Sequence, residues 1–216
     1  MEREHRGGRS GRGGDSKDVQ LSKALSYVLR HGAIKERLPI GPDAFIKLDL
    51  LLAPDWRKQQ GCTVEDIKRL VASSDKQRYA LEERQDGLYI RANQGHSIPG
   101  LTELDFKTIT DASHYPTVVH GTYHESWINI KRTGLSKMGR THIHFAKGEY
   151  GSADVISGMR QTCQVLIYIN LTLALEEGVE FVESANGVIL SPGVEGVLHP
   201  KYFARVVDAK TGQSLL

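Results

Sequence analysis

The spacing of apolar residues changes midway along the chain, and this change constrains the fold more than any other feature of the sequence. In two stretches before Pro99, residues 21–29 and 64–71, the apolar residues recur every three or four positions, as they do on one face of a helix. After Pro116 they gather in short β-branched runs, which are typical of strands. Residues 99–116 lack a clear period, and we expect an interdomain connection there. The pattern predicts an α+β protein with two lobes.

The first lobe is expected to span residues 19–98 and to begin with two helices. The first helix has apolar residues at i, i+4, i+7 and i+8, which are Leu21, Leu25, Val28 and Leu29. Gly32 is placed to end this helix, which leaves Arg30-His31 on its last turn. The second helix begins at Thr63, where Asp66 completes an aspartate variant of the capping box.

A hairpin follows these helices. Its strands, residues 78–81 and 88–91, are joined through Asp86-Gly87, a turn signal. Helices followed by a hairpin predict a winged-helix lobe, with the wing ending near residue 91.

The second lobe is expected over residues 117–216. Its short β-branched segments are residues 117–120, 143–146, 165–170, 179–182, 188–190 and 202–207. Two helical stretches interrupt them, one at residues 125–132 ending at Gly134 and one at about residues 153–161. Strands interrupted so rarely by helices predict a mainly antiparallel sheet.

Composition indicates a soluble protein whose average charge is weak. The 216 residues include 28 Lys and Arg against 26 Asp and Glu, so binding to nucleic acid must depend on local basic clusters. Cys62 and Cys163 resemble neither a disulfide framework nor a metal-binding pair, which favours a reducing compartment. No apolar run approaches the ~18 residues of a membrane span. We expect a monomer in the cytosol or nucleus.

The first 18 residues form an Arg/Gly-rich segment with no aliphatic side chain before Val19. Such a segment buries too little apolar surface to fold, so residues 1–18 are expected to be a disordered tail. Contact with RNA and simple solvation are both compatible with this composition.

A run of polar side chains after the apolar stretch Leu88-Tyr89-Ile90 is the strongest functional signal. Each of its polar members can bind an anion or donate a hydrogen bond, and none is a carboxylate. They are Arg91, Asn93, Gln94, His96 and Ser97. A half-buried strand that ends in these polar side chains predicts a phosphate or ribose site.

Three other positions have the same chemistry, and each has a structural alternative. Arg30-His31 can bind an anion or cap a helix C-terminus, where a cation gains ~0.3 to 1 kcal/mol from the dipole. His120-Gly121-Thr122 ends an apolar strand, where glycine allows close approach of a planar carboxamide such as nicotinamide. A strand-end turn with a solvent-facing histidine is its alternative. Arg140 and Arg160 lie in polar contexts, and a surface salt bridge also explains Arg160.

Two histidines share one face of a predicted strand. His142 and His144 alternate with Ile143 and Phe145, so the apolar pair should face the core. Two histidines can bind zinc, but no Cys, Asp or third His stands at a familiar ligand spacing, and we expect no metal site. A structural hydrogen bond is the alternative for each histidine.

In combination these motifs resemble those of the NAD-dependent tRNA 2'-phosphotransferases, and they occur in the family's order between Leu21 and Val207. The matching motifs are Leu29-Arg30-His31, residues 90–97, His120-Gly121-Thr122, Gly139-Arg140 through His144, residues 156–160, Asn186-Gly187-Val188 and Pro200-Lys201-Tyr202-Phe203. Two positions depart from the pattern. Asp43-Ala44 stands where the family commonly has Asp-Gly, and Phe145-Ala146 stands where it has Leu-Ser.

The resemblance implies a winged-helix RNA-binding lobe followed by an ADP-ribosyltransferase-like lobe, with NAD+ as co-substrate and 2'-phosphorylated RNA between them. The 2'-phosphate at a tRNA splice junction would attack C1'' of the nicotinamide ribose and expel nicotinamide. The ribose 2''-OH would then attack phosphorus, giving 2'-OH RNA and ADP-ribose 1'',2''-cyclic phosphate. Because the attacking phosphate is already anionic, arginine forks suit this site better than a carboxylate.

Roles follow from position in these motifs. The resemblance implies four catalytic residues, Arg30, His31, Arg91 and Arg160. It implies contacts to RNA and its phosphate from Arg30, His31, Arg91, Asn93, Gln94 and His96. It implies NAD+ contacts from His120, Gly121, Thr122, Arg140 and His144. His31 is expected to protonate the departing 2'-oxygen, because an unperturbed imidazole titrates near neutral pH.

Two other interpretations are compatible with the sequence. An ADP-ribosyltransferase that caps terminal phosphates of RNA or DNA would use the first step without the second. A non-catalytic RNA-binding module would need the hairpin and the basic tail, but neither His120-Gly121-Thr122 nor Arg160.

Overall fold

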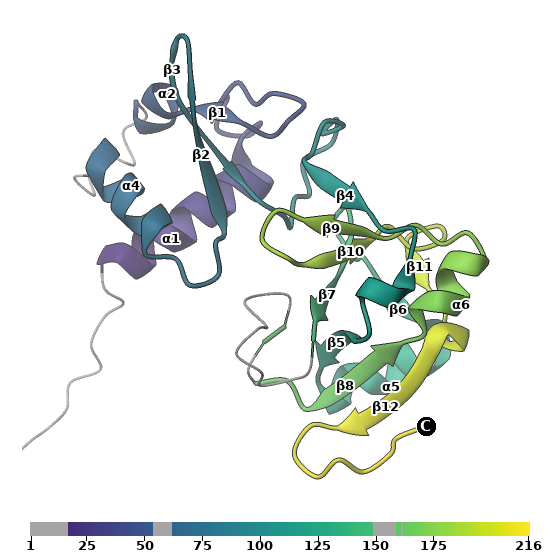
Figure 1. The fold of residues 1–216 in the computed structure, drawn as a ribbon. Coiled ribbons are helices and arrows are strands. Elements are labelled where there is room, and N and C mark those ends of the chain that lie inside the picture. The colour runs from purple at the N-terminus through teal and green to yellow at the C-terminus, as the bar shows by residue number, and fades with distance from the viewer. Residues whose placement is uncertain (1–16, 54–61, 149–158, 161) are drawn as a thin grey trace, which may run out of the picture.

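The computed structural model describes residues 17–53, 62–148, 159, 160 and 162–216. These residues form two lobes, each around its own hydrophobic core (Figure 1). The core of the N-terminal lobe runs from Leu21 to Ile98, and the main core of the C-terminal lobe runs from Ile109 to Val206. The predicted α+β class is confirmed. Most of the expected tail, residues 1–16, lies outside the described residues.

The first helix, α1 (Lys17–Tyr27), continues as a π-helical turn, η1 (Val28–Gly32). The helix forms as expected, its last turn carries Arg30 and His31, and Gly32 is its last residue, as predicted. The backbone stays right-handed at Ala33, and a Cβ on Gly32 would lie 2.7 Å from Cε1 of Tyr27. Glycine is needed here for space beside a ring, not for a left-handed cap.

A three-stranded antiparallel sheet, ordered β1-β3-β2, covers these helices (Figure 1). The elements of the lobe after η1 are β1 (Ile46–Lys47), α2 (Leu48–Leu52), α4 (Val64–Ala72), β2 (Tyr79–Arg84) and β3 (Gly87–Ala92). Arg84 pairs with Gly87, so the hairpin turn is Gln85-Asp86, one residue earlier than predicted. Gly87 opens β3 at a φ of 136°, which glycine adopts readily.

The predicted capping box at the start of α4 is present. Asp66 N donates to Thr63 Oγ1 at 3.2 Å, and Thr63 N donates to Asp66 Oδ2 at 3.0 Å. We expect Thr63→Ala to lower the free energy of unfolding by about 1 kcal/mol, because it leaves a helix N-H without a partner. Urea denaturation measures this, with Thr63→Ser as the control that keeps the hydroxyl. Equal stability of the two variants would contradict the prediction.

The C-terminal lobe is built on a seven-stranded sheet in which all pairs are antiparallel. Its order is β12-β8-β5-β7-β10-β9-β4. The strands are β4 (Phe106–Thr108), β5 (Val118–Thr122), β7 (Ile143–Lys147), β8 (Val165–Ile169), β9 (Val182–Ser184), β10 (Ile189–Ser191) and β12 (Phe203–Asp208). A two-stranded ladder joins β6 (Leu135–Ser136) to β11 (Val197–Leu198).

Helical segments connect these strands. They are η2 (Ala112–His114), α5 (His124–Thr133), α6 (Leu171–Glu176) and η3 (Pro200–Tyr202). Gly134 ends α5 at a φ of 89°, as expected. Residues 153–158 and 161 of the other expected helix lie outside the described residues, and Met159 and Arg160 are not helical. None of the described helices is long and apolar enough to cross a membrane.

Two differences from the expected strands have a common cause. Residues 106–108, which we placed in the interdomain connection, pair with β9 as an edge strand of the C-terminal sheet. The strand expected at residues 179–182 lies later, at β9. Both strands have three residues, so their positions depend on partners distant in sequence rather than on a local pattern.

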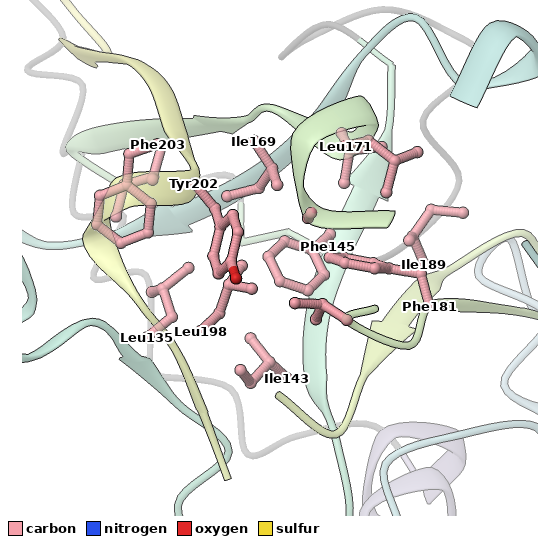
Figure 2. Packing of buried hydrophobic residues seen from close by; sticks show 14 of the residues in the cluster. Leu135, Ile143, Phe145, Ile169, Leu171, Phe181, Ile189, Leu198, Tyr202 and Phe203 are labelled. Carbon is pink, nitrogen blue, oxygen red and sulfur yellow. The ribbon is translucent and has the colours of Figure 1, made fainter. Parts of the chain in front are cut away.

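The core of the C-terminal lobe sets the direction of the β7 side chains. Ile143 and Phe145 are buried, and the Phe145 ring packs against Phe181 with centroids 5.8 Å apart (Figure 2). The predicted alternation is therefore confirmed, and His144 lies on the opposite face from Phe145.

Hydrogen bonds join the lobes at two places. Thr141 donates to the carbonyl of His96 through its N-H at 3.0 Å and through Oγ1 at 3.2 Å. Asn186 Nδ2 donates to the carbonyl of Lys76 at 3.0 Å. These contacts hold the loop after β3 and the start of β2 against the C-terminal lobe.

Candidate active site

Two adjoining cavities lie beside this junction. The first, here called the junction cavity, has a volume of about 500 Å³ and takes residues from both lobes. Its lining is Arg30, Lys76, Arg78, Gln94, His120, Gly121, Thr122, Tyr123, Ser126, Arg140, His144, Met159 and Arg160. The second, the α5 cavity, has about 560 Å³ and extends along α5 and residues 133–138. They share the walls His120, Thr122, Ser126, Arg140, His144 and Arg160.

The junction cavity is strongly basic. Five of its described lining residues are Lys or Arg, and none is Asp or Glu. Low-dielectric walls that carry one sign of charge concentrate counter-ions. The cavity is therefore suited to a ligand with several negative charges, although the net charge of the whole chain is only +2.

Arg30 is the main cation that the N-terminal lobe contributes. Its Nε is buried and has no hydrogen-bond partner among the described residues. A Cβ on Gly95 would lie 3.4 Å from this Nε, so the glycine makes room for the guanidinium. Burial lowers the pKa of Arg30, and repulsion from Arg140 and Arg78 lowers it further. An anion between these arginines would relieve that repulsion.

His31 lies next to Arg30 on the exposed side of η1. Its Nδ1 is 2.8 Å from Oγ of Ser97, and Ser97 N donates to the carbonyl of Arg30 at 2.9 Å. Partial burial lowers the pKa of His31, with further lowering from the charges of Arg30 and Arg140. The imidazole is thus oriented by Ser97 and surrounded by positive charge.

The histidines of the C-terminal lobe have unused ring nitrogens. Nδ1 of His120 donates to the carbonyl of His144 at 2.8 Å, which leaves Nε2 of His120 as an acceptor. Nε2 of His144 is buried and unpartnered within the described residues. Burial, followed by the charges of Arg140 and Arg30, lowers the pKa of His144 to about 3. Both rings are therefore neutral at physiological pH and can hydrogen-bond an uncharged group.

Gly121 lies beside sulfur rather than beside open space. A Cβ there would approach Met159 Cγ to 2.5 Å and Cys163 Sγ to 2.9 Å. Tyr123 Oη lies 2.9 Å from Oγ1 of Thr162, and hydrogen bonding to Thr162 and then to Arg160 lowers the pKa of the Tyr123 phenol. Met159 therefore packs against Gly121, which still lines the junction cavity, while Arg160 reaches both cavities.

Comparison with known proteins places this site in a family. The sequence model described as "RNA 2'-phosphotransferase, Tpt1 / KptA family" matches residues 16–193. The chain belongs to this RNA 2'-phosphotransferase family. It is 48% identical to tRNA 2'-phosphotransferase 1 of Danio rerio over 219 residues, which cover 97% of this chain and 96% of that protein. The resemblance found in the motifs is thus confirmed.

Other members of the RNA 2'-phosphotransferase family are nearly as similar. The human protein named tRNA 2'-phosphotransferase 1 is 48% identical over 90% of this chain and 77% of its own length. The Saccharomyces cerevisiae tRNA 2'-phosphotransferase is 41% identical over 83% of this chain and 81% of its own length. Similarity of this extent includes most of this chain.

Within this family member, the segment after β3 sends only one side chain, Gln94, into the cavities. Arg91 is 9% exposed, and its Nη2 donates to Oδ2 of Asp105 at 3.1 Å while its guanidinium lies 4.7 Å above the Phe45 ring. Asn93 Nδ2 donates to the carbonyl of Gln77 at 2.6 Å. Neither Arg91 nor Asn93 lines the site in this structure.

Two cavity residues, Lys76 and Arg78, were not predicted. They precede β2 and Tyr79, and the N-H of Asn93 donates to the carbonyl of Arg78 at 2.9 Å, which places Arg78 beside the polar segment. Two basic residues directly before the first hairpin strand were the available signal. Nothing in the sequence indicated that they share a wall with Arg140 and Arg160.

His96 supports the junction rather than lining it. The side chain is fully buried, and neither ring nitrogen has a partner among the described residues. Burial, with the charges of Arg30 and Arg91, lowers the pKa of His96 to about 4. A neutral histidine here adds no positive charge to the crowded arginines.

Stability should therefore fall as the pH falls from 7 to 5. Between about pH 6.5 and 4 the unfolded chain binds a proton at His96 that the folded protein does not, so stability is lost on acidification. His96 alone should lower the free energy of unfolding by about 1 to 2 kcal/mol between pH 7 and pH 5. Urea denaturation at pH 7 and pH 5 should show a smaller loss of unfolding free energy in His96→Gln than in wild type. His114→Gln, at a side chain that is 79% exposed, should keep the wild-type difference; equal pH dependence in all three proteins would contradict the prediction.

Proposed function

We propose that this protein removes the 2'-phosphate from the splice junction of ligated tRNA by transferring it to NAD+. The observation that carries the proposal is the junction cavity, whose described lining has five cations and no carboxylate. Family membership and the printed names of the relatives support the RNA 2'-phosphate as substrate. On this proposal, the N-terminal lobe is a winged-helix RNA-binding lobe and the C-terminal lobe is ADP-ribosyltransferase-like.

The absence of a carboxylate from the described lining suits a phosphate nucleophile. A phosphate oxygen attacks C1'' of the nicotinamide ribose, the bond to nicotinamide breaks, and nicotinamide leaves with the electron pair. The product is 2'-phospho-ADP-ribosylated RNA. The attacking oxygen is already ionised, so no general base is needed, and a nearby carboxylate would repel it. Arg30 and Arg160, from opposite lobes, can hold the phosphate between them.

The second step returns the RNA. The ribose 2''-OH attacks phosphorus and releases its proton to water, the bond from phosphorus to the RNA 2'-oxygen breaks, and that oxygen takes up a proton, so the step changes the number of bound protons by zero. His31 is the proposed donor, because it lies beside Arg30 and Ser97 orients its ring. Arg30 and Arg160 stabilise the charge that gathers on the phosphorus oxygens. ADP-ribose 1'',2''-cyclic phosphate is the second product.

The two cavities together provide room for NAD+. Their volumes are about 500 and 560 Å³, and a shared wall of His120, Thr122, Arg140 and His144 runs between them. The buried, unpartnered Nε2 of His144 is an orphan polar atom for which such a ligand supplies a partner. Arg140 suits the pyrophosphate, and the neutral rings of His120 and His144 suit uncharged ribose or carboxamide groups.

Arg91 has a different status from the other proposed catalytic residues. Its proposed contact with the RNA phosphate requires that it leave Asp105, whose side chain is 76% exposed. The Arg91 guanidinium is buried but the Asp105 carboxylate remains mostly in solvent, so water already weakens the pair and a phosphate can compete for the guanidinium. The proposal for Arg91 therefore includes a change of partner on RNA binding.

One assay tests the function. The protein is incubated with NAD+ and either a 2'-phosphorylated oligoribonucleotide or the same oligonucleotide with a free 2'-OH. We expect nicotinamide release and a cyclic phosphate product only with the first. Stable ADP-ribose on the RNA, or on a terminal phosphate, without cyclic product would show that only the first step occurs. RNA binding without nicotinamide release would indicate a binding module.

A further inference from the structure

A third cavity adjoins the site, and five of its seven described lining residues have no part in the chemistry proposed above. It is an open groove of about 340 Å³, here called the α1 groove. Its lining is Ser22, Lys23, Ser26, Tyr27, Arg30, His31 and Arg78. Arg30 and Arg78 line both this groove and the junction cavity, so the two are continuous. The described lining of the groove, like that of the cavity, includes no Asp or Glu.

The groove is built by two adjacent rows of side chains on one helix. Ser22, Ser26 and Arg30 form one row at i, i+4 and i+8, and Lys23, Tyr27 and His31 form the next. The buried Tyr79 hydroxyl fixes this helix to β2, because it donates to the carbonyl of Ser22 at 2.7 Å and lies 2.7 Å from Oγ of Ser26. Arg78, the residue before Tyr79, is held beside the helix by the same contacts.

Tyr27 is an aromatic side chain held in an open position. Its ring lies against Gly32, where any Cβ would collide with it, and its centroid is 6.5 Å from that of His31. The residue is nevertheless 46% exposed. A ring that is supported from below and exposed to solvent, beside cations, is the usual platform on which single-stranded RNA bases stack.

Arg78 supplies a cation between the groove and the cavity. It is half-buried and lines the same two cavities as Arg30, and its charge contributes to the lowered pKa of Arg30. Two arginines in one wall, without an intervening carboxylate among the described lining residues, favour an anion in contact with both. The phosphate that follows or precedes the modified nucleotide is such an anion.

We propose that the α1 groove binds the nucleotide next to the 2'-phosphorylated one, with Tyr27 stacked on its base and Arg78 on the phosphodiester that links the two nucleotides. This inference rests on the proposed RNA substrate and deepens it. The groove would make the protein prefer a 2'-phosphate inside an RNA strand to an isolated phosphate monoester, because only a strand fills both the junction cavity and the α1 groove.

The base contact can be tested by equilibrium binding without NAD+. Three fluorescent oligoribonucleotides carry the same internal 2'-phosphate, and two of them lack the base on the 5' or the 3' neighbour. Wild-type protein should bind one of these two about tenfold more weakly than the intact strand. Tyr27→Ala should bind the intact strand about tenfold more weakly than wild type does. It should bind the base-deleted strand that wild type disfavours with the same affinity as wild type. An equal loss by Tyr27→Ala on all three strands, or wild-type affinity that ignores both deletions, would overturn the proposal.

Two further variants separate stacking from folding. Tyr27→Phe keeps the ring and should recover most of the affinity lost in Tyr27→Ala, whereas Tyr27→Leu keeps an apolar cover on Gly32 and should not. Thermal unfolding of each variant checks that the helix is intact. Recovery by Leu equal to that by Phe would show that Tyr27 only supports the helix.

The phosphate contact has a separate signature. Arg78→Ala should reduce the slope of log Kd against log salt concentration by about 0.7, the value for one contact to single-stranded nucleic acid. Arg132→Ala is the matched control, because Arg132 is exposed on α5 and lines none of the three cavities. Identical slopes for the Arg78 variant and wild type would overturn this contact.

The same oligonucleotides test the proposed reaction and the proposed α1 groove separately. If wild-type protein releases nicotinamide with the 2'-phosphorylated strand but ignores both missing bases, the groove proposal is wrong and the function stands. If it distinguishes the missing bases but releases no nicotinamide, the groove stands and the proposed reaction is wrong.

Discussion

Replacing Arg30 with alanine is expected to lower the single-turnover rate of 2'-phosphate transfer to NAD+ by about 10² to 10³. Among the described residues, Arg30 combines a buried Nε that lacks a hydrogen-bond partner with a place in the lining of both the junction cavity and the α1 groove. A preorganised donor in a site of low dielectric stabilises transition-state charge without reorganisation, and the loss of one such donor has an effect of this size. Rapid quenching with labelled RNA measures the rate.

Two comparisons show whether the effect comes from the guanidinium fork. Arg30→Lys keeps a charge but offers no bidentate donor, so it should recover only a small part of the rate. Arg132→Ala removes an exposed arginine outside the cavities and should keep the wild-type rate. Circular dichroism and thermal unfolding establish that the Arg30 variants fold. A correctly folded Arg30→Ala protein within twofold of wild type would contradict the assignment.

The elements that sequence predicted well are those whose signals are local. The capping box of Thr63 and Asp66 formed as expected, because both partners lie in one helical turn. Ile143 and Phe145 entered the core, because alternation along a strand fixes the two faces. The edge strand β4 was missed, because its three residues gain strand geometry only by pairing with β9, more than seventy positions away.

One departure from the family pattern falls at a left-handed backbone position. Ala44 stands where the family commonly has glycine, and it takes a φ of 66° in the left-handed region that glycine favours. Asp43 Oδ1 accepts from Phe45 N at 3.1 Å, which is the local hydrogen bond of a turn. Alanine in this conformation costs about 1 kcal/mol in backbone strain.

For the site, motifs predicted which residues have suitable chemistry but not which of them meet. Arg30, His120, Arg140 and Arg160 come together because the lobes pack through Thr141 and His96. Arg91 was expected to be central, yet it pairs with Asp105, a residue in the segment that we treated only as a connection. Lys76 and Arg78 entered the site without a motif of their own. Packing between lobes decides such outcomes, and a linear pattern does not contain that information.

Removing the His31 imidazole is expected to slow the second step by about 10² to 10⁴ while it leaves the first step much faster than the second. The first step needs no proton transfer to the RNA, because a phosphate oxygen attacks C1''. The second step produces an alkoxide at the RNA 2'-oxygen unless a proton reaches it as the bond to phosphorus breaks. In His31→Ala, 2'-phospho-ADP-ribosylated RNA should therefore accumulate after nicotinamide has been released.

If His31 donates the proton, the rate of the second step must change with pH in one direction. His31 acts as an acid only when protonated, so the rate of the second step should fall as the pH rises through its pKa. Burial and the charges of Arg30 and Arg140 hold that pKa below its usual value in the free protein, whereas a bound phosphate should raise it. Quenched reactions between pH 5.5 and 8.5 should show this decline in wild type and lose it in His31→Gln, which keeps a polar group near Ser97 but carries no titratable proton. If His31→Ala releases RNA from the intermediate at the wild-type rate, or if its decline with pH matches wild type, another group supplies the proton and His31 only binds the phosphate.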